Sequence, residues 1–401
     1  MAKLAVSRTH RVLLVIVGVL LTATMVSMVM LWPSGADEGE IAGDVEELED
    51  LVDGEILTVD IIQTDVDELT GLSGEMAILE VELHDGPDAG SVIDLEIPTD
   101  GFPEIREGDR VALDRTIDPE GDTQYFITDF QRLPALAWLV GLFVVAVLVV
   151  SRWHGFRALV GLGISLLVVV QFIVPAIIDG ASPPVVALVG AVAVMIVTLY
   201  LTHGINEQTT AAVAGTTGAL ALTVGLGLVF ISQSRITGFA SDDAVFARFA
   251  VDGLDLQGLV LAGLIIAALG VLDDVTIAQA STVFALHDTD RNLNWPTLFK
   301  RAMKVGRDHI ASVVNTLFLA YTGASIALFL LFSTGGVSTT EILNTEVLAV
   351  EIVKTVVGSL GLIAAVPLTT ALATTVAIQR QGPHRSSPQS AKTGPNTEGL
   401  R

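Results

Sequence analysis

The sequence of 401 residues contains no cysteine. This absence excludes disulfide bonds, thiolate metal sites and a cysteine-linked lipid anchor, although it leaves an oxidising exterior permitted. Charged residues are also scarce, at 16% of the chain, whereas soluble domains contain roughly 25%. Hydrophobic residues make up 51%, and the mean hydropathy is +0.65. This composition indicates an integral membrane protein.

The signatures of common enzymes are absent as well. The sequence has no HExxH, GxSxG or CxxC motif, no Walker loop and no GxGxxG after a predicted strand. Such motifs would supply a zinc site, a nucleophile, a redox pair or a phosphate-binding loop. We therefore expect a protein that is not an enzyme and that binds no cofactor.

Negative charge is concentrated in one part of the chain. The formal net charge is −24, and 30 of the 45 acidic residues lie between Asp37 and Asp129. Such a region suits a basic partner or cation-rich surroundings, but the favoured interpretation is that the charge only keeps a domain soluble. No nucleic acid partner is expected, because phosphates would be repelled.

Eight apolar stretches are long enough to cross the roughly 30 Å core of a bilayer, which takes about 20 helical residues. They lie near residues 12–31, 134–151, 157–178, 184–202, 208–232, 256–285, 309–333 and 347–378. The sequence therefore predicts an all-α polytopic membrane bundle of about eight transmembrane helices.

Lysine and arginine mark alternate loops between these stretches. They cluster at Lys3, Arg8 and Arg11, at Arg152 and Arg157, at Arg291, Lys300, Arg301, Lys304 and Arg307, and at Arg380, Arg385 and Lys392. By the positive-inside rule these loops are cytoplasmic. The pattern predicts both termini in the cytoplasm and residues 33–133, 179–183, 234–255 and 334–346 outside. Residues 1–32 are then a retained anchor, although "SGA" at 34–36 resembles a signal-peptide cleavage site.

The first exported stretch combines a spacer with a folded domain. Residues 33–53 include "ADEGEIAGDVEELED", which is too acidic and too poor in large apolar residues to pack, so we expect a flexible spacer. Residues 54–133 contain five segments of β-formers between turn signals. They predict a small all-β domain, an OB or SH3-like barrel. Within it, His84 and Asp85 suggest a metal or acid–base pair, but a polar hairpin turn is the favoured interpretation.

The remaining chain is expected to form a seven-helix transmembrane domain, residues 134–379, and a disordered cytoplasmic tail, residues 380–401, rich in proline, serine and glycine. Between two of the spans, "DRNLNWPTLFKRAMKVGRDH" predicts an amphipathic helix with one basic face. We expect it to lie along the inner lipid headgroups. A regulatory partner site is the alternative.

Two neighbouring carboxylates, Asp273 and Asp274, follow a long apolar run in "GVLDDVTIAQAS". Facing lipid, the pair would cost roughly 5–7 kcal/mol. In one interpretation the helix ends at the cytoplasmic interface and Asp274 caps a short surface helix. In the other, the span continues to about Ala285 and the pair is buried in its cytoplasmic half. Thr276 and Ser281 share a polar or small helical face with the pair, which favours burial.

The buried interpretation predicts a binding site. Asn315 and Thr316 of the seventh span lie at the same expected depth, and Pro367 of the eighth span can kink its helix and free a carbonyl oxygen. Together, carboxylate, amide, hydroxyl and carbonyl oxygens suit a hard cation or a proton relay. These residues leave the identity of any metal open.

The last span carries a further charged pair, Glu351 and Lys354, near its expected outer mouth. Their spacing of three favours an intrahelical ion pair, and an outer gate is the functional alternative. Small residues such as Gly215 and Gly361 are expected to permit close helix packing.

Three stretches, "GVLDDVTIAQAS", "NTLFLAYTGAS" and "EIVKTVVGSLGLIAAVPLTT", together resemble the YibE/F family of bacterial multi-pass membrane proteins. The resemblance covers about residues 130–380, and the exported barrel matches more loosely. It implies a multi-pass protein of the bacterial plasma membrane. It implies no substrate and no catalytic residues.

These features predict a permease or channel for an ion or small solute, with the two aspartates as a cation or proton site in the cytoplasmic half. The partners are then the lipid bilayer and a small solute or cation, and the sequence does not fix the oligomeric state. The alternative is a non-transporting membrane scaffold or sensor whose acidic exported domain binds a partner.

Overall fold

The structure is a computed structural model that describes residues 8–33, 51–63, 75–99, 104–117, 123–334, 336 and 338–380. It contains two compact units. The first, which we call the helical unit, comprises Met1–Glu38 and Phe156–Arg401. The second, Gly39–Gly155, combines a sheet, residues 51–130, which we call the β unit, with the first part of the helix that follows it. Most of the predicted spacer and nearly all of the predicted tail lie outside the described residues.

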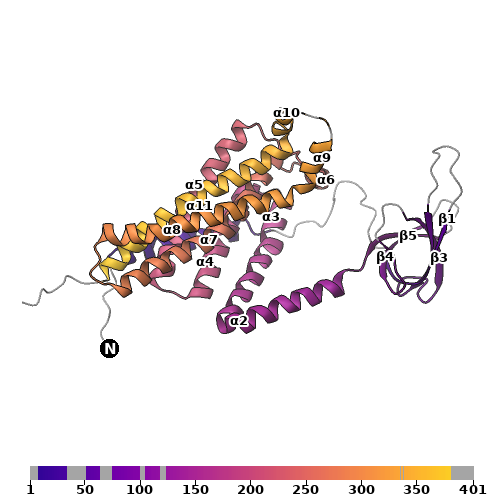
Figure 1. Ribbon diagram of the computed structural model, residues 1–401, viewed down its shortest axis with the longest axis horizontal. Coiled ribbons are helices and arrows are strands. Elements are labelled where there is room, and N and C mark those ends of the chain that lie inside the picture. The colour runs from indigo at the N-terminus through magenta and orange to yellow at the C-terminus, as the bar shows by residue number, and fades with distance from the viewer. Residues whose placement is uncertain are drawn as a thin grey trace, which may run out of the picture. The chain divides into compact units, whose positions relative to one another are not determined.

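The β unit is a five-stranded antiparallel sheet that curls into an open half-barrel (Figure 1). Its strands are β1 (Leu51–Gln63), β2 (Glu75–Leu83), β3 (Val92–Pro98), β4 (Arg110–Ile117) and β5 (Thr123–Phe130). The strand order is β3-β2-β1-β4-β5. The five predicted strands are confirmed, but the first begins at Leu51, so residues 51–53 belong to the sheet and not to the spacer.

The central strand β1 bends so that it pairs with β4 through its first half and with β2 through most of its length. A register shift between Ile56 and Thr58 permits this bend. Gly54 is needed here, because a Cβ atom would lie 2.7 Å from the side chain of Val81 and 2.9 Å from that of Leu113. Alternate side chains of the strands therefore point to one face of the sheet, where they pack closely into a largely aliphatic core.

The turn after β2 explains the pair of polar residues noted in the sequence. The Asp85 carboxylate accepts a hydrogen bond of 2.6 Å from the backbone N–H of Asp53. His84 Nε2 lies 3.9 Å from the Glu55 carboxylate. Among the residues that the structure describes, no group of three His, Cys, Asp or Glu side chains could hold a metal ion. Both residues thus act as parts of a hairpin turn.

The helical part of the chain consists of eleven helices and one π-helical turn within the described ranges. They are α1 (Arg8–Met30), α2 (Leu133–Val168), the π-helix η2 (Val169–Ile173), α3 (Val174–Ile178), α4 (Pro183–His203), α5 (Glu207–Gln233), α6 (Asp242–Ala250), α7 (Leu256–Thr289), α8 (Trp295–Ala324), α9 (Ile326–Thr334), α10 (Thr339–Leu343) and α11 (Glu346–Gln379).

The described helices give six candidate membrane spans, or seven if α8 and α9, which are bent by 59°, form one. The sequence predicts eight. The difference lies in Leu133–Ile178, a helical segment of 46 residues that counts as one span. At 1.5 Å per residue, 46 residues amount to about 69 Å of helix in total, which is enough for two crossings of a bilayer core. Arg152, at φ 50° and ψ −125°, is the one non-helical residue inside α2.

Helices α5, α7 and α11 pack against one another at the centre of the helical unit (Figure 1). Glycines permit this approach at two matching places on α5 and α11. A Cβ on Gly215 would collide with Thr369, and one on Gly361 would collide with Thr223. Each glycine thus receives a threonine of the antiparallel partner, as predicted for these small residues.

Hydrogen bonds and ion pairs show which helix ends lie together. At one end of the bundle, the Thr9 N–H donates to Gln379 Oε1 at 3.0 Å, and Arg380 Nε lies 3.8 Å from Glu207 Oε2. The start of α1 and the start of α5 therefore meet the end of α11. At the other end, the Glu346 carboxylate accepts hydrogen bonds from the backbone of Thr237 and Gly238.

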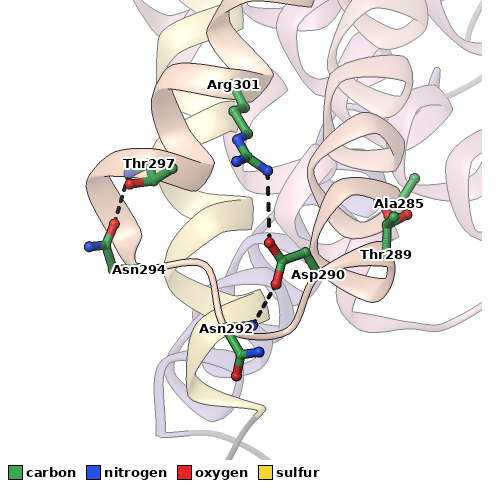
Figure 2. Close-up of polar contacts among 7 residues, drawn as sticks. All are labelled: Ala285, Thr289, Asp290, Asn292, Asn294, Thr297 and Arg301. Carbon is green, nitrogen blue, oxygen red and sulfur yellow. Dashed lines mark hydrogen bonds and ion pairs between the residues drawn. The ribbon is translucent and has the colours of Figure 1, made fainter.

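The connection from α7 to α8 is a short polar loop (Figure 2). Asp290 accepts a hydrogen bond from the Asn292 N–H at 3.1 Å and lies 3.9 Å from Arg301 NH1. Asn294 then caps α8 by accepting from the Thr297 N–H at 3.1 Å. These contacts fix where α8 begins.

The predicted amphipathic helix is confirmed as the first part of α8, which continues without a break to Ala324. Its buried seam consists of Leu298, Ala302 and Gly306, and α8 packs against α7 and α11. Its basic residues remain exposed. Spacing identifies the apolar face of a helix but not what covers it, and here α7 and α11 pack against α8. That the basic face lies along the inner headgroups stays a prediction.

Candidate functional site

Helix α7 carries the two aspartates in its interior. It runs without interruption from Leu256 to Thr289, and its N-cap is Asp255, which accepts from the Gly258 N–H at 2.9 Å. Asp273 and Asp274 therefore cap nothing. The sequence allowed either a helix that ends before the aspartates or a helix that continues past them. The structure has the continuous helix.

The two carboxylates have different surroundings. Asp273 is half-buried, and its Oδ1 atom is fully buried with no hydrogen-bond partner among the described residues. An oxygen left in this state costs roughly 1–3 kcal/mol, and more when charged. Asp274 is more exposed and interacts electrostatically with His203 of α4 and His309 of α8. Asp273 therefore has an acceptor oxygen without a hydrogen-bond donor, whereas Asp274 has two histidine side chains nearby.

A pocket of about 440 Å³ opens beside the pair, within the helical unit. Its walls come from α2, η2, α4 and α7. The polar side chains that line it are Ser165, Thr198, Thr202, His203, Asp273 and Asp274. Gly161, Gly190 and Gly270 also line it, and small residues of this kind leave room between helices. The π-helical turn supplies Val169 and Ile173, and such turns are frequent at functional sites.

The other two predicted residues of α7 point to helix packing and not into this pocket. Thr276 is buried, and its hydroxyl lies 2.6 Å from that of Thr216 on α5. Ser281 accepts from the Gln208 amide, also of α5, and donates to the Ile277 carbonyl at 2.7 Å. Both residues therefore tie α7 to α5, which holds one side of the helix that carries the aspartates.

Comparison with known protein families matches residues 139–379 to the YibE/F-like proteins. The chain belongs to this family. Every residue that lines the pocket falls within the matched range, whereas the five strands precede it. No curated protein and no solved structure matches the chain. The chain is thus a multi-span YibE/F-like membrane protein, and the match assigns no activity to the pocket.

Within the YibE/F-like region, the residues predicted on α8 lie apart from the pocket. Asn315 and Thr316 are exposed and are absent from its lining. The Thr316 hydroxyl donates to the Ser312 carbonyl of its own helix at 3.0 Å. The prediction that Asn315 and Thr316 join the aspartates, which followed from their similar depth in the membrane, is therefore wrong for this pocket.

Helix α11 of the YibE/F-like region contributes a buried polar stretch around Pro367. The hydroxyls of Thr369 and Thr374 are buried without a hydrogen-bond partner among the described residues. Gln279 of α7, which is 1% exposed, donates to the Thr370 hydroxyl at 2.8 Å and to the Ala302 carbonyl at 3.1 Å. One amide thus links α7, α8 and α11 on the side where Pro367 interrupts the helical hydrogen bonds.

Several of these residues were missed by the sequence reasoning. The sequence analysis does not predict Gln279 of α7, nor Ser165, Thr198 and Thr202 of the pocket. A polar residue inside an otherwise apolar span is the signal that would have found them, since such groups usually face protein or a cavity.

Glu351 and Lys354 form the expected intrahelical ion pair, with Nζ 3.0 Å from Oε1. They line a second cavity of about 250 Å³, together with residues of α6 and the start of α7. The cavity lies toward the end of the bundle where Glu346 binds the loop after α5, because all three residues occupy the first turns of α11.

Proposed function

We propose that this YibE/F-like protein is a permease or channel for an ion or small solute, and that Asp273 and Asp274 form its central site. The observation that carries the proposal is the buried, unpartnered Oδ1 of Asp273 at the edge of a pocket. Ionisable groups inside spans are costly and usually mark ion or proton pathways. A passing cation or proton would satisfy this oxygen and relieve the repulsion between neighbouring carboxylates.

The pocket chemistry narrows the occupant to something small. Its volume of about 440 Å³ lies in the range of small-ligand sites. Two carboxylates and three hydroxyl side chains offer oxygen ligands, which hard cations prefer. The proposal gives these residues no catalytic role, and it gives Glu351 and Lys354 the role of a gate at the other end of the bundle.

We further propose that the protein crosses a bacterial plasma membrane eight times, with α2 divided at Arg152 into two spans. Both termini are then cytoplasmic, residues 33–133 are extracytoplasmic and the site lies in the cytoplasmic half. The contact of α1 with the end of α11 supports termini on one side. Reporter fusions after His154 should read as cytoplasmic and fusions after Asp243 as exterior; an interior reading at Asp243 would refute this topology.

The central test removes the charge of Asp273 by replacing one carboxylate oxygen with an amide nitrogen. Asp273→Asn keeps the size of the side chain, so the protein should fold with unchanged or slightly raised thermal stability. Flux of protons or of monovalent and divalent cations into liposomes that contain the purified protein should be lost. Asp288→Asn, on the exposed end of the same helix, is the matched control and should retain the flux. Full activity of Asp273→Asn would refute the proposed site.

The acidic β unit favours the alternative of a scaffold or sensor that binds a partner outside the membrane. Deletion of residues 51–132 distinguishes the two proposals, because they predict different effects on activity. A transporter should still carry its solute at a reduced or normal rate, whereas a sensor would lose its response entirely.

A further inference from the structure

The two edge strands of the β unit run in the same direction. β2 is antiparallel to β1 and β3, and β4 is antiparallel to β1 and β5. Both β3 and β5 therefore run parallel to β1, so they cannot close the barrel as an antiparallel pair. Among the described residues no backbone hydrogen bond joins them. One strand of the opposite direction, placed between them, would pair antiparallel with both edges.

A groove lies where that strand would go. Its volume is about 770 Å³, and it is lined by both β3 and β5. The inner row of side chains along it is apolar, with Ile93, Leu95 and Ile97 on β3 and Ile127 on β5. At one end the Tyr125 hydroxyl donates to the Asp88 carboxylate at 2.7 Å. A guest strand would thus turn alternate side chains toward an apolar interior.

The outer rim of the groove is acidic. Asp94 and Glu96 alternate with the apolar residues of β3 and are exposed, and Asp88 lies in the preceding turn. No lysine or arginine is among the described residues that line the groove. The charged side chains that line the groove are therefore all acidic.

The segments that precede and follow β1 in the sequence do not complement the groove in charge. Residues 34–50 and 64–74 contain acidic residues and no lysine or arginine. A second copy of the β unit would bring the same negative charge, which like-charge repulsion disfavours. The complementary occupant is a basic segment of another protein.

We infer that the β unit binds an extended basic peptide of another protein as a sixth strand between β3 and β5. The peptide is five to eight residues long, because β3 has 7 residues and β5 has 8. It alternates apolar residues, which face inward, with lysine or arginine, which face Asp94 and Glu96. Main-chain hydrogen bonds to both edges supply affinity and the alternating side chains supply specificity. This inference does not depend on the proposed transport site.

The test uses the full chain in nanodiscs of uncharged phosphatidylcholine, with empty nanodiscs as the blank. A fluorescent octapeptide that alternates valine and lysine should bind saturably, and the same peptide with glutamate for lysine should not. Asp94→Asn combined with Glu96→Gln should weaken binding about fivefold at low salt. The matched control is Asp53→Asn combined with Asp60→Asn, which removes two exposed charges from the central strand and should change affinity less than about twofold.

A second probe separates strand addition from charge attraction alone. The valine–lysine peptide methylated on alternate backbone nitrogens keeps its charges but loses its donors along one edge, so it should bind at least about tenfold more weakly. Equal binding of the methylated peptide, or equal weakening by the control variant, would overturn the inference. Self-association of the full chain that the peptide displaces would assign the groove to a second copy and would overturn it as well.

Discussion

The β unit and the helical unit place their polar groups in opposite ways. In the described β unit the buried side chains are aliphatic apart from Tyr125, and the carboxylates lie on the surface. In the helical unit the exposed surface is rich in large apolar residues, while threonine, glutamine and histidine side chains are buried. The surface of the first unit suits water and that of the second suits lipid, so each unit buries the groups that such surroundings would not solvate.

This difference changes what a buried group can do. An aliphatic core has only packing to contribute, so its residues specify the fold. A buried hydroxyl or carboxylate must find a partner, and one that finds none within the protein has room to accept a bond from water or to hold an ion. The unpartnered oxygens of Asp273, Thr369 and Thr374 are of this second kind.

The largest expected effect tests the β core. Leu79→Ala removes a fully buried side chain of β2 and should lower the free energy of unfolding of the β unit by about 2–5 kcal/mol. Hydrogen exchange of the strand amides in the full chain would measure it. Ile61→Ala, at a side chain 64% exposed, is the control and should cost about 0.5 kcal/mol or less. Equal effects would mean that the sheet has no distinct interior.

The next effect tests the packing of the helical unit. Gly215→Ala adds one methyl group where Thr369 already lies, and it should destabilise the bundle by about 1–3 kcal/mol. Gly225→Ala, on the same helix but facing open space, should be neutral or stabilise by up to about 1 kcal/mol, because alanine favours helices. Thermal unfolding followed by size-exclusion chromatography would measure both. A stabilising Gly215→Ala would refute the close approach of α5 and α11.

The sequence predicts the two units unequally well, for physical reasons. Alternating side chains and turn residues identify all five strands, because their period follows from strand geometry. The start of β1 is missed because Leu51 and Val52 directly follow an acidic run, although Val52 is buried in the sheet. Apolar length identifies the spans, and the non-helical residue Arg152 falls between the stretches 134–151 and 157–178 that the sequence separates.

The candidate site is predicted only in part. The helical face of Asp273, Thr276 and Ser281 correctly indicates a continuous α7. The depth of Asn315 follows from counting residues, but which way its side chain points depends on how α8 packs, and no local pattern encodes that. The wall from α2 and α4 is missed for the same reason, since Ser165 and Thr198 become neighbours of the aspartates only through tertiary packing.

The smallest expected effect concerns the Tyr125 hydroxyl, and it tests whether this buried polar group contributes to the stability of the β unit. Burial raises the pKa of the Tyr125 hydroxyl above its usual value, and the nearby Asp88 raises it further. Because this pKa is higher in the folded state, the contribution to stability is complete below about pH 10, the pKa of an unfolded tyrosine. It is lost as pH rises through the folded pKa.

Tyr125→Phe removes this pH-dependent contribution together with a single hydrogen bond, so stability at neutral pH should fall by only about 1 kcal/mol. Subtracting the ultraviolet titration of Tyr125→Phe from that of the unmodified protein isolates the Tyr125 transition, which should lie above about pH 10. Asp88→Asn should lower that transition while leaving it above the usual value, since burial is the larger cause. A transition at the usual value in the unmodified protein would mean that Tyr125 is solvated and that the groove between β3 and β5 is open to water at this end.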